Sequence, residues 1–88
     1  MPKYHWEMKE IDKKRQLIFG KNLLRIRTEK RLSQDEIAAR CRVTKGNLSV
    51  IENGGRNFSF STLLALAKGL DVQPKELLDV DFELNEEA

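Results

Sequence analysis

Apolar residues recur at helical spacing in the first third of the chain, where residues 7–31 are rich in helix formers. They form an imperfect stripe made of Ile11, Ile18, Phe19, Leu23 and Ile26. We therefore predict one helix that begins between Glu7 and Lys14. The basic run at residues 13–15 is either a solvated face of this helix or an arm that meets a nucleic-acid backbone.

Helix-start signals follow directly after this stretch. Ser33 and Glu36 have the spacing of a capping box, in which the hydroxyl accepts from the backbone N–H of Glu36 and the carboxylate accepts from the N–H of Ser33. Leu32 and Ile37 are placed for a hydrophobic staple across the same helix start. We therefore predict that a helix begins just after Ser33.

A second helix start lies at Thr44, where Val43 and Leu48 are placed for another staple. Only residues 41–43 separate the two helices. A connection this short makes two helices cross steeply and leaves one face of the second helix free to enter a groove, as in a helix-turn-helix. A well-capped helical hairpin with no role in DNA binding would show similar start signals, and this alternative stays open at this point.

The second helix of this pair has two unlike faces. At about 100° per residue, Thr44, Leu48, Ile51 and Glu52 gather on one side, which we expect to face the protein. The opposite face has small and polar residues and no acidic side chain. Its members are Lys45, Gly46, Asn47, Ser49, Val50 and Asn53. A phosphate-lined groove would accept such a face, because these residue types can pair with base edges or phosphates.

The last third of the chain predicts two more helices. Gly54 and Gly55 suit a helix stop after Asn53, and Ser59 is placed as the cap of the next helix. The predicted core positions of that helix are Phe60, Leu63, Leu64, Ala67 and Leu70. Pro74 suits the first position of a short final helix, where its missing N–H costs nothing. The predicted fold class is therefore all-α.

Four segments of the chain resemble the lambda-repressor-like, Cro/CI-type helix-turn-helix family, also called the XRE family. They read GKNLLRIR, LSQDEIAARCRV, TKGNLSVIENGGRN and FSFSTLLALAKGLDVQPKELL, and they span about Gly20 to Leu78. The resemblance implies a five-helix domain in which the second and third helices bind DNA. The RN pair after ENGG is similar to controller proteins of restriction-modification systems, which are small and dimeric.

The resemblance also implies roles for particular residues. The base-facing positions are Lys45, Gly46, Asn47, Ser49 and Val50. Gln34, Arg56 and Asn57 match positions of the family that contact the DNA backbone. Arg42, Thr44 and Asn53 are further expected contacts to the backbone, on the residues themselves and not on the resemblance. Arg27 and Glu52 align with a pair that forms a largely buried ion pair in phage repressors of the family; two exposed charges are the alternative.

Two positions depart from the family pattern. Residues 31 and 42 are usually glycine in the family, where the chain leaves a helix in a left-handed conformation, and both are arginine here. An arginine in that conformation costs about 1–2 kcal/mol, which a stable domain tolerates. Arg42 in the turn is either a residue that reaches a phosphate or a plain surface arginine.

Charge is divided unevenly along the chain. Residues 1–70 hold 15 Lys and Arg against 7 acidic residues, and residues 71–88 hold 1 against 7, so the net charges of +8 and −6 sum to +2. A basic body with an acidic tail is typical of a nucleic-acid binder, although ordinary solvated charge is the alternative. We expect double-stranded DNA as the partner and no small-molecule ligand.

Several classes of function are disfavoured. One histidine and one cysteine, remote in sequence, cannot make a structural zinc site, and we expect Cys41 to pack in the core and no metal or cofactor to bind. No nucleophile and base pair or phosphate-binding glycine loop is present, so we do not expect an enzyme. The sequence has no run of about 18 apolar residues and no signal peptide, and we expect a cytoplasmic protein.

We divide the chain into an N-terminal arm at 1–12, a helix-turn-helix domain at 13–79 and an acidic tail at 80–88. The predicted function is sequence-specific binding of a palindromic operator by a dimer that represses or controls transcription. The predicted dimer interface consists of Leu77, Leu78, Val80 and Phe82. The alternative is an antitoxin or another protein-interaction module in which DNA binding is secondary. Its contact residues would be Trp6, Phe82 and Leu84.

Overall fold

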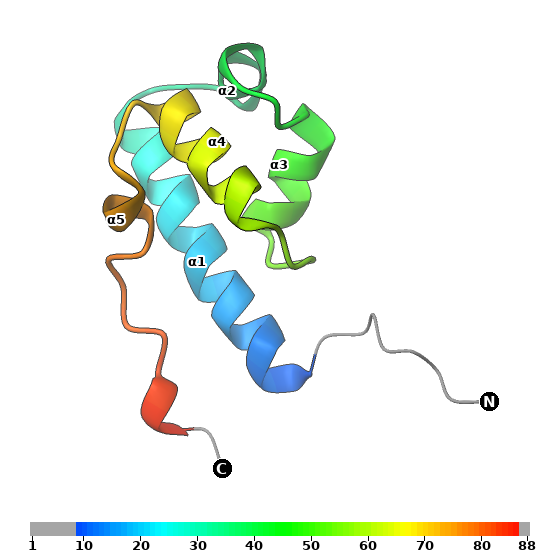
Figure 1. Ribbon diagram of the computed structural model, residues 1–88, viewed down its shortest axis with the longest axis vertical. Helices are drawn as coiled ribbons and strands as arrows, with labels where there is room; N and C mark the ends of the chain where they lie inside the picture. Colours follow the sequence, from blue (N-terminus) through cyan, green and yellow to red (C-terminus); the bar gives the residue numbers. More distant parts are fainter. Residues whose placement is uncertain (1–8, 87–88) are drawn as a thin grey trace, which may run out of the picture.

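Five α-helices and one short 3-10 helix make up the described part of the protein, residues 9–86 of the computed structural model (Figure 1). The helices are α1 (Glu10–Glu29), α2 (Gln34–Arg40), α3 (Lys45–Glu52), α4 (Phe60–Leu70) and α5 (Pro74–Leu77), and the 3-10 helix η1 covers Leu84–Glu86. The predicted all-α, five-helix fold is confirmed.

The predicted caps form the helix starts. Ser33 Oγ accepts from the N–H of Glu36 at 3.0 Å, and a Glu36 carboxylate oxygen accepts from the N–H of Ser33 at 2.8 Å. The hydrogen bond that the Glu36 carboxylate accepts from the backbone N–H of Ser33, and after it one from the Ser33 side chain, lowers the pKa of Glu36. Thr44 and Ser59 cap α3 and α4 in the same way, each accepting from a backbone N–H at 3.1 Å.

Helix α1 runs through the molecule and packs against α3 on one flank and α5 on the other (Figure 1). Gly20 permits the close approach to α3. A Cβ atom at Gly20 would lie 2.6 Å from the carbonyl oxygen of Ile51 and closer still to that of Glu52. On the other flank Asn22, which is buried, donates to the carbonyl oxygens of Glu76 and Leu77 at 3.0 and 3.1 Å.

All five helices contribute to the core, in which α4 packs on α2 and α5, and α1 packs on α3 and α5. Its fully buried side chains are Leu23, Ile37, Leu48, Ile51, Leu66, Leu70 and Leu77. The prediction that Phe60 and Leu64 belong to the core is wrong, because Phe60 is 71% exposed and Leu64 is 41% exposed. The buried stripe of α4 instead runs through Leu63, Leu66 and Ala67, which leaves Phe60 and Leu64 at the solvent edge.

The two family glycine positions differ from each other in conformation. Arg31 has φ of 60°, so the expected left-handed residue is present after α1. Arg42 does not have a positive φ, and its predicted left-handed conformation is wrong. The chain leaves α2 through Cys41, which is extended at φ −144° and ψ −177°, so no left-handed residue is needed there. Gly54 ends the α3 region with φ of 70°.

The segment after α5 returns along the N-terminal half of α1. Arg15 donates to the carbonyl oxygens of Phe82 and Glu83 at 3.1 and 3.2 Å, and Lys14 forms an ion pair with Glu83. Phe82 is half-buried and packs against the core. Two residues of the basic run at 13–15 therefore bind the acidic tail of the same chain. Helix α1 begins at Glu10, inside the segment 1–12 that was assigned to the arm.

Candidate nucleic-acid interface

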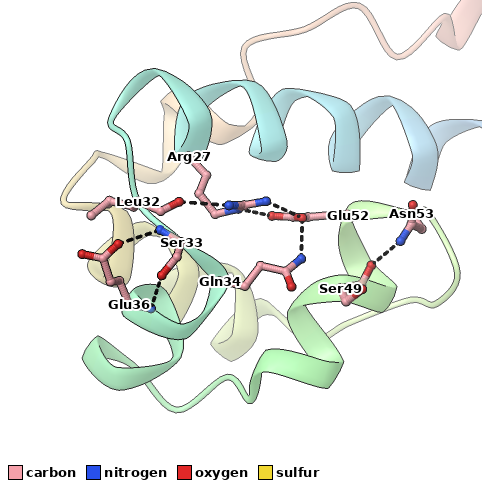
Figure 2. A network of polar contacts seen from close by, with 8 residues as sticks. All are labelled: Arg27, Leu32, Ser33, Gln34, Glu36, Ser49, Glu52 and Asn53. Carbon is pink, nitrogen blue, oxygen red and sulfur yellow. Dashed lines mark hydrogen bonds and ion pairs between the residues drawn. The ribbon is translucent and has the colours of Figure 1, made fainter.

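A buried ion pair sets the position of α3. Arg27 of α1 donates to both carboxylate oxygens of Glu52 at the end of α3, at 2.6 and 3.1 Å (Figure 2). The side chains of Arg27 and Glu52 are only 15% and 6% exposed. These two residues are therefore paired and buried, and they do not form the exposed charges that the sequence left open.

Two further hydrogen bonds extend this pair to the start of α2. Arg27 also donates to the carbonyl oxygen of Leu32 at 2.9 Å, and the amide of Gln34 donates to Glu52 at 2.8 Å (Figure 2). Glu52 thus accepts three hydrogen bonds in a site from which water is largely excluded. The network joins α1, the first turn of α2 and the last turn of α3, so the two helices of the helix-turn-helix are held at one fixed angle.

The two faces of α3 differ in burial. Leu48 and Ile51 have no exposed surface and Glu52 is buried, as expected for the protein side. Thr44 is exposed, in contrast to the helix-period prediction, because its hydroxyl caps the helix from outside the core. The outer face is open: Lys45, Gly46 and Asn53 are exposed, and Asn47, Ser49 and Val50 are half-buried. A Cβ atom at Gly46 would have no atom within 4 Å.

Two polar side chains of the outer face bind side chains from neighbouring elements. Lys45 Nζ lies 3.3 Å from a carboxylate oxygen of Asp35, and both side chains are mostly exposed, at 59% and 75%. Arg56 donates to the Asn47 side-chain oxygen at 2.9 Å. Exposed contacts of this kind contribute little to stability, so these side chains can exchange their present partners for groups on a ligand.

The loop between α3 and α4 borders the same face. Arg56 and Asn57 are both exposed, and Arg56 reaches α3 through Asn47. Arg42 and Asn47 share the lining of a shallow hollow of about 140 Å³ with residues of the first turns of α4. The structure therefore brings Arg42, Asn47 and Arg56 together, and Lys45 lies on the first turn of the same helix as Asn47. The Gln34 amide is instead turned to Glu52, and Asn53 Nδ2 donates to the carbonyl oxygen of Ser49 at 2.9 Å.

Gln16 is a residue of this region that the sequence did not point to. It lies on α1, and its amide donates to the Asn57 side-chain oxygen at 2.7 Å. Asp35, the partner of Lys45, was also missed. No local sequence pattern marks either residue. The contact of Gln16 joins two segments that are far apart in the chain, and the contact of Asp35 joins α2 to α3 across the turn.

The predicted dimer residues fall into different environments. Leu77 has no exposed surface and belongs to the core of its own chain, so it offers nothing to a partner and we withdraw it from the predicted interface. Leu78 is 45% exposed, whereas Val80 and Phe82 are half-buried. Of the contacts named for the alternative protein-interaction module, Trp6 lies outside the described residues and Leu84 is 68% exposed.

Residues 23–77 match the HTH_3 family, described as helix-turn-helix. The match spans more than half of the chain and includes α2, α3 and the ion-pair residues. The chain belongs to this family of XRE-type DNA-binding transcription regulators.

Its relatives include control proteins of restriction-modification systems. The chain is 41% identical over 64 residues to the control protein C.BamHI of Bacillus amyloliquefaciens, covering 72% of this chain and 79% of that protein. The crystal structure of the restriction-modification controller protein C.AhdI from Aeromonas hydrophila superposes with a TM-score of 0.68 at 37% identity, over 70% of this chain and 94% of that one. The crystal structure of the clp gene regulator ClgR from C. glutamicum superposes with the same TM-score at 26% identity. It covers 73% of this chain and 83% of that one.

The described residues add two observations about other classes of function. Between residues 9 and 86, no three His, Cys, Asp or Glu side chains are grouped so that they could hold a metal ion. Within the same range, no helix is long and apolar enough to cross a membrane. Cys41 is partly buried against the core, and its thiol donates to the carbonyl oxygen of Ile37 at 3.3 Å.

Proposed function

We propose that this protein binds a palindromic operator in double-stranded DNA as a two-fold dimer and so controls transcription. The observation that carries the proposal is the outer face of α3, which has no acidic side chain and is held in place by the buried Arg27–Glu52 pair. The likeness to restriction-modification control proteins supports a role in regulating the genes of a restriction-modification system.

The chemistry of the outer face suggests how bases are distinguished. Lys45 can donate to guanine O6 and N7, Asn47 can pair with the adenine edge, and Val50 can contact a thymine methyl group. Gly46 leaves room for a close approach, and Ser49 can donate or accept. Contacts to phosphates would come from Gln34, Arg42, Thr44, Asn53, Arg56 and Asn57, and would fix the register of α3 in the major groove.

Dimerisation is the second part of the proposal. One recognition helix covers only a few base pairs, whereas two related by a two-fold axis read half-sites about 34 Å apart. Exposed apolar side chains support an interface near α4 and α5: Phe60 and Leu64 lie one turn apart on α4, and Leu78 follows α5. Val80 and Phe82 remain candidates at its border. Sedimentation at high micromolar concentration tests this part, and a monomer would remove it.

DNA retention by the purified protein tests the proposed recognition face. Lys45→Ala combined with Asn47→Ala should abolish retention of duplex DNA at near-physiological salt. Lys68→Ala is the matched control, since it removes one exposed positive charge from α4 and should leave retention close to that of the parent. Retention by the parent should fall by about 0.9 log unit per log unit of salt for each phosphate neutralised.

A further inference from the structure

The loop that follows α3 is held from two sides. On the side of α3, the Gly55 N–H donates to the carbonyl oxygen of Val50 at 2.9 Å, and Arg56 donates to Asn47. On the other side, the loop lies against the N-terminal half of α1. An exposed loop without helical hydrogen bonds of its own is thereby kept in one conformation.

Three contacts fix the loop on α1. Phe58 packs on Phe19 with ring centroids 4.8 Å apart. Gly54 sits so close to Leu17 that a Cβ atom there would lie 2.8 Å from the Leu17 backbone. Both ends of the loop are therefore anchored by packing, and the third contact, from Gln16 to Asn57, lies between these two anchors.

Gln16 is poorly explained as a stabilising residue. Among the described residues 9–86, its Oε1 is the one buried side-chain oxygen or nitrogen that makes no hydrogen bond to another protein group. A buried carbonyl oxygen without a partner lowers stability, so a side chain of this kind has a net cost unless its other contact is useful. That other contact is the 2.7 Å hydrogen bond to Asn57, an exposed residue beside the recognition face.

We infer that Gln16 is a positioning residue for DNA recognition, acting through Asn57. This inference rests on the proposed function. Gln16 holds the Asn57 side chain in one orientation before DNA arrives, so that binding does not have to order it. Because Gly54 and Phe58 anchor the loop without Gln16, loss of the amide frees the Asn57 side chain and leaves the backbone of the loop in place.

A double-mutant cycle on the duplex selected from a random pool tests the inference. Gln16→Met keeps the length and helix preference of the side chain and removes its donor. We expect Gln16→Met and Asn57→Ala each to weaken binding by about threefold to tenfold, the range of one hydrogen bond. The double variant should bind no more weakly than Asn57→Ala alone, because Gln16 acts only through that residue.

Two controls separate positioning from a structural role. The melting temperature of Gln16→Met should equal or exceed that of the parent, since the unpaired carbonyl is gone; Gln16→Ala gives a second test of the same point. When Gln16→Met is combined with Lys45→Ala, the fold-losses of DNA affinity of the two single variants should multiply, because those residues do not touch. Effects of Gln16→Met and Asn57→Ala that multiply, an unchanged affinity of Gln16→Met, or a loss of affinity that follows a lowered melting temperature would overturn the inference.

The same experiment separates the inference from the proposed function. If the parent protein selects no duplex from the pool, the proposed function fails and the inference fails with it. If the parent selects an operator and the cycle shows independent sites, only the role of Gln16 is refuted.

Discussion

Two sets of polar contacts hold the helix-turn-helix region, and they differ in burial. The inner set joins Arg27 and Glu52, whose side chains are 15% and 6% exposed. The outer set includes Lys45 and Asp35, whose side chains are 59% and 75% exposed. Each set contains a cation that donates a hydrogen bond to a carboxylate, so the amount of water around the pair decides what it can do.

The inner contacts fix geometry, and the outer contacts remain available to a ligand. Removing one partner of a buried pair leaves an uncompensated charge and costs about 3–5 kcal/mol, whereas an exposed pair contributes about 0–1 kcal/mol. The outer face of α3, which we propose recognises DNA, is thus held in a rigid position while its side chains can exchange partners. The predictions below test this division.

The largest effect is expected at the inner pair. Arg27→Ala leaves Glu52 buried without its cation and should lower the free energy of unfolding by about 3–5 kcal/mol. Thermal or urea unfolding followed by circular dichroism measures this change. The double variant Arg27→Met, Glu52→Leu should recover much of the loss, because it buries no charge. A single variant that melts with the parent would show that the pair does not hold the fold.

Two glycine variants next compare the side of α3 that packs against α1 with the exposed outer face of α3. Gly20→Ala places a methyl group against the carbonyl oxygens of Ile51 and Glu52 and should cost about 1–3 kcal/mol through the shift of α1 away from α3. Gly46→Ala adds the same methyl group in open space on the outer face, and alanine is the better helix former, so stability should stay level or rise. Equal melting temperatures for the two variants would contradict the close approach at Gly20.

Asp35→Asn tests the outer pair by itself. Stability should change by no more than about 0.5 kcal/mol, as for surface substitutions in general. DNA affinity should rise modestly, because the variant removes a negative charge beside the phosphates and releases Lys45. Titration of parent and variant at two salt concentrations measures the difference, which should shrink at high salt. An affinity that falls would mean that Asp35 orients Lys45 for binding.

The smallest effect is expected at Glu36, whose carboxylate caps α2. Hydrogen bonds from Ser33 lower the pKa of Glu36 from its usual 4.5, so the folded state favours the ionised form. The stabilisation is therefore present above pH 4.5 and is lost as the pH falls through the lowered value. Glu36→Gln keeps a cap that does not titrate, so parent and variant should converge in melting temperature as the solution is acidified. A constant gap would contradict the capping role.

Local signals made most of the fold predictable. The caps at Ser33, Thr44 and Ser59 depend on residues three positions away, so short stretches of sequence were enough to place α2, α3 and α4. Apolar periodicity predicted that α4 is amphipathic, but it did not determine the rotation of the helix about its axis. Phe60 and Leu64 were placed in the core for this reason, and Leu66 was missed.

Contacts between distant segments were the part that the sequence did not predict. Asn22 binds two carbonyl oxygens at α5, and Gln16 binds Asn57, yet each looks like an ordinary polar residue of α1. The Arg27–Glu52 pair was expected only through the family resemblance, since its partners lie 25 residues apart. Assigning Leu77 to an interface failed because neighbouring leucines at the end of a short helix look alike before their exposure is known.

Selection of duplexes from a random pool by the purified protein at near-physiological salt, followed by sequencing of the retained DNA, tests the central claim most directly. The account predicts a palindromic consensus with half-sites one helical turn apart, or a multiple of one turn, and its loss with the combined Lys45→Ala, Asn47→Ala variant. A retained pool with no enriched sequence, or a consensus unchanged by that variant, would contradict recognition by the outer face of α3.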